Sequence, residues 1–176
     1  MTTLNFFKVC VLFLVTATLP NISFGQAKLT DPEIANVAVV ANQIDIDYAK
    51  LAMQKSKNAE ILAFAKTMAN DHKAVIDQAV ALVKKLGVTP KDNSFGRQLQ
   101  AGAKKTTTRL KVAKGKAFEK AYIDNEVAYH KAVISAVEGR LIPESQNAEL
   151  RNLLQQVLPT LKAHLQHAEM VQKNHK

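Results

Sequence analysis

The chain has 176 residues. About 150 of them follow a predicted N-terminal leader and form the mature chain, which is long enough to fold as one domain with its own core. The formal net charge of the full chain is +9, from 24 lysines and arginines against 15 aspartates and glutamates. The one cysteine, Cys10, lies in the predicted leader described below. Disulfides, thiolate metal ligands and cysteine nucleophiles are therefore excluded from the mature chain.

The N-terminal residues have the pattern of a secretory signal. One positive charge at Lys8 precedes an apolar run, Val9–Leu19, which is shorter than the roughly 20 residues needed to span a bilayer. Small residues then permit cleavage after Gly25 or Ala27. We predict a cleaved signal peptide over residues 1–25 and export across the inner membrane to the periplasm or cell envelope. An uncleaved anchor is the alternative.

Residues 26–176 form a single domain with helical periodicity throughout and no persistent alternating strand pattern. Thr30 followed by Pro32 and Glu33 predicts the start of the first helix. Pro159 falls inside the last helix and should kink or break it. Long helices are expected over four segments: Asp31–Ser56, Asn58–Gly87, Lys116–Leu141, and a segment from Ser145 or Asn147 to Lys173.

A connection over residues 87–115 joins the two predicted hairpins of long helices. A short helix over Ser94–Lys105 is expected within it, because Thr106–Thr108 weakens any longer one. Long crossovers of this kind occur in ferritin-like bundles, whereas simple up-and-down bundles use short loops. We therefore predict an all-α, ferritin-like four-helix bundle with a long crossover that contains a short extra helix. An elongated array of helical hairpins is the alternative.

Most of the positive charge lies between Lys84 and Lys120. This stretch has eleven basic residues and two acidic ones, a sum of +9, so the rest of the mature chain sums to −1. Such a surface could contact anionic envelope components, or it could be an ordinary solvated connection. Aromatic residues are nearly absent from it and lysines outnumber arginines, which argues against specific recognition of nucleic acid.

Three histidines lie on or beside the apolar stripes of three different predicted helices, near the middle of the bundle. They are His72, His130 and His164, and Glu126 precedes His130 by one helical turn. These residues predict a metal site with the three imidazoles as ligands and Glu126, or an aspartate of the first helix, as the acidic companion. Zinc or copper would suit such a set, and the thioether of Met68 would favour copper.

A second interpretation stays open for the same residues. Buried histidines could form hydrogen bonds with tyrosines or acids in a polar layer that sets the register of the helices, with Met68 as core filler. The candidate tyrosines are Tyr48, Tyr122 and Tyr129. His167 lies at the edge of its stripe and His175 in the tail, so both are weaker candidates. Asp71 should point about 100° away from His72 around the helix, toward a neighbouring helix or solvent.

Three spaced strings in the mature chain resemble the signatures of one bacterial family, domain of unknown function 4142. The strings are Phe64-Ala65-x-x-Met68-x-x-Asp71-His72, Phe118-x-x-x-Tyr122 followed by Tyr129-His130, and Leu158-Pro159-x-Leu161-x-x-His164-Leu165. The resemblance covers nearly the whole mature chain. It implies an exported, ferritin-like helical bundle without an established activity. It also implies four signature positions: Asp71, His72, His130 and His164.

A ferritin-type di-iron centre fits the sequence less well than zinc or copper. Such centres use a Glu-x-x-His pair on each of two helices and two further glutamates. The second helix offers Asp71 and His72 without that spacing, and the first helix offers only aspartates at its centre. Enzymes other than metalloenzymes are also disfavoured, since the chain has no nucleophile beside a base, no glycine-rich phosphate loop and no convincing pair of carboxylates. A metalloenzyme ranks third, after the two functions given next.

Two functions of different kinds are therefore predicted. One is an exported envelope protein that binds a metal ion through the histidine cluster. The other is a structural or interaction module with a histidine–tyrosine polar core and a basic surface for anionic envelope components.

Overall fold

A computed structural model describes residues 27–175, none of which lies in a strand. The predicted signal peptide over residues 1–25 lies outside the described residues. No helix of the described part is long and apolar enough to cross a membrane. The helices are α1 (Asp31–Lys55), α2 (Ala59–Lys85), α3 (Ser94–Val112), α4 (Gly115–Ala136), the π-helical turn η1 (Val137–Leu141), α5 (Ile142–Glu144) and α6 (Ala148–Asn174).

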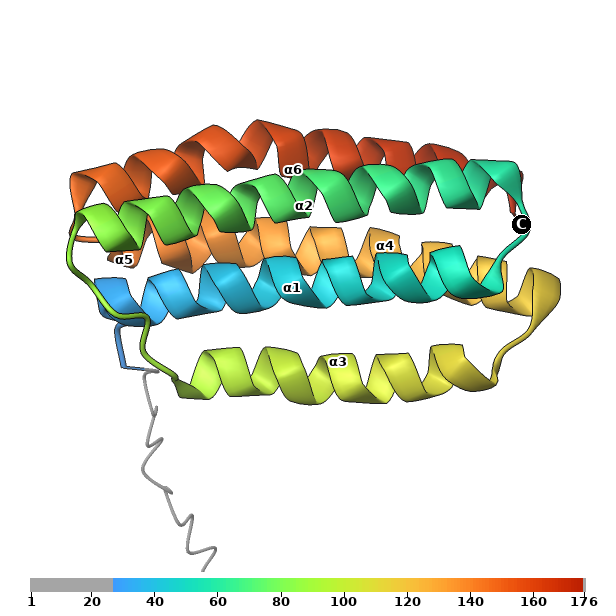
Figure 1. Ribbon diagram of the computed structural model, residues 1–176, viewed down its shortest axis with the longest axis horizontal. Helices are drawn as coiled ribbons and strands as arrows, with labels where there is room; N and C mark the ends of the chain where they lie inside the picture. Colours follow the sequence, from blue (N-terminus) through green and yellow to red (C-terminus); the bar gives the residue numbers. More distant parts are fainter. Residues whose placement is uncertain (1–26, 176) are drawn as a thin grey trace, which may run out of the picture.

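Four long helices form the bundle, and the crossover helix lies outside it. Helix α1 is paired with α2 and α4 with α6, while α3 runs along the outer side of α1 (Figure 1). The chain passes from the first hairpin to the second through α3, which together with its flanking linkers runs from one end of the bundle to the other (Figure 1). The predicted four-helix bundle with a long helical crossover is thus confirmed.

Side-chain caps mark where the helices begin. The Glu33 carboxylate accepts a hydrogen bond from the Thr30 backbone N–H at 2.9 Å, before the first turn of α1. Asn58 accepts from the N–H groups of the first turn of α2, and Asn147 does the same for α6. Asn93 accepts from Gly96 N–H at the start of α3. These caps satisfy N–H groups that have no partner within their own helix.

Helix α3 is longer than the sequence predicts, since it continues past Lys105 to Val112. Leu110 is fully buried against the core, and the Lys55 ammonium donates a hydrogen bond to its carbonyl at 3.1 Å. The Thr108 hydroxyl bonds to the Lys104 carbonyl inside the same helix. Packing of Leu110 therefore outweighs the weak helix propensity of the threonines.

Helix α6 continues through Pro159 without a break. The proline ring lies on the exposed side of the helix. Its missing N–H removes the usual partner of the Gln155 carbonyl, which lies on an exposed residue where water can replace it. Of the two outcomes predicted for Pro159, a break is therefore excluded.

The buried apolar residues form two clusters, one toward each end of the bundle. The first is rich in aromatic and large side chains, including Phe64, Phe118 and Tyr122. The second contains aliphatic residues such as Ile34, Leu141 and Leu154. Buried polar residues of the four long helices, Asp45, His72, His130 and His164, lie together between these two clusters.

We predict that Leu110→Ala lowers the free energy of unfolding by about 2–5 kcal/mol, because it leaves a cavity where α3 is anchored to the bundle. Urea unfolding followed by circular dichroism measures the change. Val112→Ala is the matched control, since Val112 is 74% exposed in the same helix and should change stability by less than about 0.5 kcal/mol. Equal stabilities of the two variants would show that α3 is not anchored through Leu110.

Candidate metal centre

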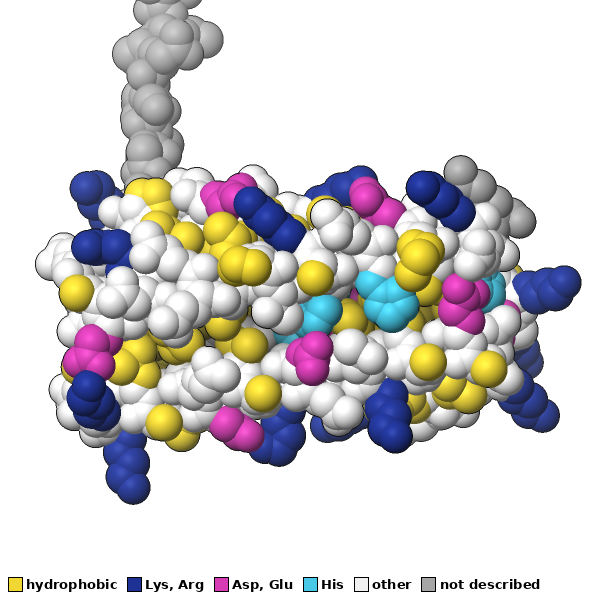
Figure 2. Space-filling view, turned by 90° about the horizontal axis from the view of Figure 1, so that it is seen from above, with side chains coloured by type: hydrophobic (Ala, Val, Ile, Leu, Met, Phe, Trp, Pro, Cys, Tyr) yellow, Lys and Arg dark blue, Asp and Glu magenta, His cyan; other side chains and the backbone are white. Residues whose placement is uncertain are grey.

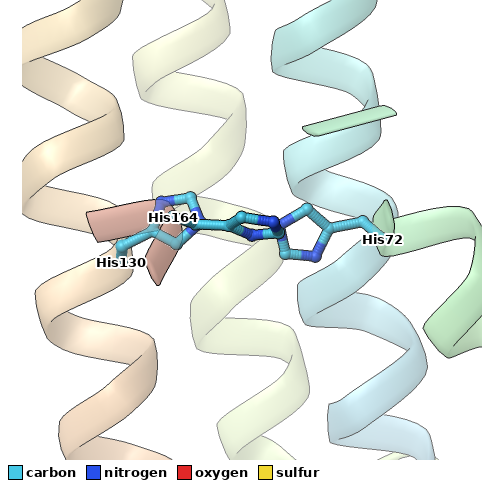
Figure 3. A group of neighbouring side chains, drawn as sticks. All are labelled: His72, His130 and His164. Carbon is cyan, nitrogen blue, oxygen red and sulfur yellow. The ribbon is translucent and has the colours of Figure 1, made fainter. Parts of the chain in front are cut away.

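Three imidazoles meet at the centre of the bundle, each from a different helix. His72 comes from α2, His130 from α4 and His164 from α6, and their rings point toward one another (Figure 3). The ring centroids lie 5.2 Å apart for His72 and His164, and 5.6 Å apart for each of the other two pairs. All three residues are at most 5% exposed. One potential ligand atom from each lies within 4.8 Å of those of the other two.

Each histidine uses one ring nitrogen for a hydrogen bond to a group outside this trio. His72 Nδ1 is 2.7 Å from Asn42 Oδ1, and His164 Nε2 is 2.9 Å from Asp71 Oδ2. His130 Nδ1 is 3.0 Å from the Glu126 backbone carbonyl. These oxygens accept, so we assign the ring proton to that nitrogen in each case.

The other nitrogen of each ring then carries a free lone pair. These atoms are His72 Nε2, His130 Nε2 and His164 Nδ1, and all three are buried without a hydrogen-bond partner among residues 27–175. Outer hydrogen bonds that fix the tautomer and orientation of a histidine are the usual second layer of a metal site. Three such nitrogens can bind one ion.

Asp45 of α1 is the carboxylate that lies beside the unpaired nitrogens of two of the histidines. Its Oδ2 lies 3.4 Å from His72 Nε2 and 3.7 Å from His130 Nε2, and its side chain is fully buried. Glu126 is equally buried, but its Oε2 lies 3.7 Å from His130 Nδ1, the nitrogen that already bonds to a carbonyl. The sequence favours Glu126 as the acidic companion and keeps an aspartate of the first helix as the alternative. In the structure Asp45 of that helix lies beside the unpaired nitrogens of the trio.

The remaining residues considered from the sequence lie around this group. Asp71 of α2 points toward the neighbouring helix α6, one of the two directions expected from the sequence, and accepts a hydrogen bond from His164. Met68 is fully buried in the aromatic-rich cluster. His167 packs against Phe64 with ring centroids 5.0 Å apart, and His175 pairs with Glu60 at 3.2 Å. Neither of these two histidines joins the trio.

The tyrosines do not form hydrogen bonds with the histidines in the part of the chain that the structure describes. Tyr129 donates its hydroxyl proton to the Ala41 carbonyl at 2.8 Å and packs edge-on against Tyr48. The Tyr122 hydroxyl is buried without a partner among the described residues. A layer of histidine–tyrosine hydrogen bonds is therefore not what orients these imidazoles.

Burial favours the neutral form of the ionisable groups in this centre. It lowers the pKa of His72 to about 3, helped by the nearby His130 and His164, and lowers the pKa of His130 to about 4. Burial raises the pKa of Asp45 to about 8. It also raises the pKa of Glu126 well above its ordinary value, with the charge of Asp45 as a second cause. The imidazole lone pairs of His72 and His130 are thus free at neutral pH.

Comparison with known proteins places the chain in a family. The sequence profile of DUF4142, described as a domain of unknown function, matches residues 18–171. The chain belongs to this family. The resemblance of its three sequence strings is thereby confirmed, and the family's description names no activity. No curated protein matches the chain.

One solved structure similar to this protein is described as CopM in the Cu(II)-bound form. It has a TM-score of 0.62 and 17% sequence identity, and the alignment covers 83% of this chain and 98% of that chain. At this identity the similarity concerns the fold. It agrees with the helical bundle described above.

We predict that Asp45→Asn stabilises the metal-free protein as the pH rises. The raised pKa of Asp45 means that the folded protein holds a proton that the unfolded chain loses above about pH 3.8. That contribution is present in full below pH 3.8 and is lost as the pH rises toward 8. The advantage of the variant should therefore grow by up to about 1.4 kcal/mol per pH unit between pH 4 and 7.

Urea unfolding in the presence of a chelator, at several pH values, measures this advantage. Asp47→Asn is the matched control, because Asp47 lies on the same helix with its side chain 59% exposed. It should follow the wild type at every pH. An Asp45→Asn advantage that does not vary with pH would show that the carboxyl group ionises normally in the folded protein.

Proposed function

We propose that this protein is an exported envelope protein that binds a copper ion in the bundle core, through His72, His130 and His164. The observation that carries this proposal is a set of three neighbouring histidines, with ligand atoms within 4.8 Å of one another. In each ring an outer hydrogen bond occupies one nitrogen and the other nitrogen is buried without a partner. A buried polar atom left without a partner costs about 1–3 kcal/mol of folding free energy. A metal ion would satisfy all three atoms at once.

The donor set favours a borderline transition metal. Imidazole nitrogen suits copper and zinc, and for a given set of such ligands copper(II) binds more strongly than zinc. The similarity of the fold to a chain solved in the Cu(II)-bound form supports copper as the first ion to test. Asp45 would supply a fourth, negatively charged ligand, since a bound cation favours the ionised carboxylate.

Glu126 has a different role in this proposal. Its carboxylate faces the Nδ1 side of His130, so it is placed to orient that ring and to balance the charge of the ion. The mature chain contains no thiol. The proposed centre is therefore built from nitrogen and carboxylate oxygen, without a thiolate ligand that an oxidising compartment would convert to a disulfide.

The location and the surface partner stay predictions. The leader favours the periplasm or cell envelope, and export is consistent with a metal centre free of cysteine. Helix α3 has no acidic residue and most of its lysines and arginines are exposed, which is compatible with contact to anionic envelope components.

We predict that the purified mature protein binds one copper(II) ion and that His72→Ala, His130→Ala or His164→Ala weakens this binding by more than about 100-fold. The magnitude follows because loss of an outer-layer partner alone costs 10–100-fold, and a ligand contributes more. Isothermal titration calorimetry measures the affinity, and electron paramagnetic resonance counts the nitrogen ligands of copper(II). Zinc, titrated in parallel, tests the choice of ion.

His167→Ala is the control for these variants, because His167 packs against Phe64 outside the trio. It should keep the wild-type affinity. Retention of copper by all three trio variants would refute the site. If the trio variants fail to fold and the wild type binds no metal, the polar-layer interpretation is supported instead.

We predict a smaller effect for the outer hydrogen bonds. Asp71→Ala removes the acceptor of His164 Nε2–H and should weaken copper binding by about 10–100-fold without changing the number of ions bound. Competition with a chromophoric chelator measures the affinity. Asn70→Ala, an exposed neighbour on the same helix, serves as the control. A loss of affinity as large as that of His164→Ala would mean that Asp71 is itself a ligand.

A further inference from the structure

A cavity of about 420 Å³ lies inside the bundle and ends at the histidine trio. It occupies the half of the bundle that contains the start of α1 and α6 and the end of α2 and α4. On the face formed by α2 and α6, hydrophobic side chains line a shallow groove beside histidine side chains (Figure 2). The lining of the cavity is mostly apolar, with Val75, Val133, Leu154 and Leu161 among its residues.

Small side chains explain why this half of the core is hollow. Six alanines from α1, α2 and α4 line the cavity, and methyl groups cannot reach across a bundle whose helix axes are 8–10 Å apart. They are Ala35, Ala38, Ala41, Ala79, Ala132 and Ala136. An engineered apolar cavity of about 150 Å³ binds benzene, and ligand pockets usually measure about 300–1,000 Å³. The cavity is thus large enough for a small organic molecule.

Its shape indicates a long ligand with one polar end. The lining extends along α1 from Ala35 to Asp45, a distance of about 15 Å at the helical rise. The strongly polar side chains gather at the inner end, where the histidine trio and Asp45 lie beside Asn42. A hydrocarbon chain would fill the apolar part and place its head group at the trio.

The chemistry of that inner end selects the head group. The free ring nitrogens offer lone pairs and no N–H, so without a metal they attract cations and repel anions. A divalent ion on the three nitrogens reverses this preference, since it supplies positive charge and coordinates carboxylate oxygen. We infer that the cavity binds a medium-chain fatty acid whose carboxylate completes the coordination of the bound copper ion, an inference that rests on the metal site proposed above.

The experiment titrates decanoate into the copper-loaded and the metal-free mature protein by calorimetry. Decanoate should bind the copper-loaded protein with one-to-one stoichiometry, and at least 10-fold more weakly when the metal is absent. Decylamine, of equal chain length and opposite charge, should show the reverse preference. Octanoate should bind about fourfold more weakly for each methylene group that it lacks relative to decanoate. Electron paramagnetic resonance of copper(II) should change when decanoate is added.

Variants that fill the cavity separate this inference from the metal site. Ala79→Leu places a larger side chain in the cavity and should abolish decanoate binding while copper affinity stays within a factor of about three. Ala136→Leu, on α4, provides a second variant should the first fold poorly. Ala63→Leu is the matched control, since Ala63 is exposed on the same helix as Ala79.

Each outcome decides one of the two proposals. If copper binds and decanoate does not, the proposal of a fatty-acid ligand is overturned and the proposal of a metal site is retained. Equal decanoate affinity with and without copper would show that the carboxylate does not coordinate the ion. Equal affinity in Ala79→Leu and the wild type would show that decanoate does not bind in the cavity. Either result overturns the fatty-acid proposal. Failure of copper to bind overturns both proposals together.

Discussion

The organisation of this protein depends on a buried polar layer across an apolar bundle. His72, His130 and His164 come from three helices and Asp45 from the fourth, so their mutual contacts tie all four helices together at one level. A shift of one helix by a single turn would move its polar group into an apolar cluster, where it would have no partner. The layer therefore sets the relative register of the helices, whether or not an ion occupies it.

The two apolar clusters on either side of this layer are packed differently, and that difference has consequences. Phe64, Phe118 and Tyr122 fill one half of the bundle with rings in contact. Alanines face each other in the other half and leave space. Since dense packing supplies most of the stability of a core, the aromatic half can hold the histidines in place while the other half stays hollow. The polar layer thus has a densely packed aromatic cluster on one side and a cavity on the other.

Much of this arrangement follows from the sequence, and what does not follow depends on rotation and tertiary contact. Helical periodicity and antiparallel hairpins suffice to bring His72, His130 and His164 to one level. They do not tell which way α1 is turned. Asp45 and Asp47 both flank the apolar stripe of α1, yet one is fully buried and the other is 59% exposed. Residues two positions apart point about 200° away from each other around a helix. A modest error in the predicted direction of the apolar stripe therefore exchanges which of the two aspartates is buried.

The choice between a metal centre and a plain polar layer depends on where the lone pairs point. A layer that served only packing would be most stable with each ring nitrogen paired, because unpaired buried atoms raise the free energy of the folded state. Here three acceptors on three segments, Asn42, Asp71 and the Glu126 carbonyl, each take the proton on one side of a ring. The three remaining nitrogens are buried without a hydrogen-bond partner among residues 27–175, and the three histidines offer ligand atoms within 4.8 Å of one another. Each of these hydrogen bonds assigns the proton to one ring nitrogen and leaves the other unprotonated, which is the state in which an imidazole nitrogen can bind a metal ion.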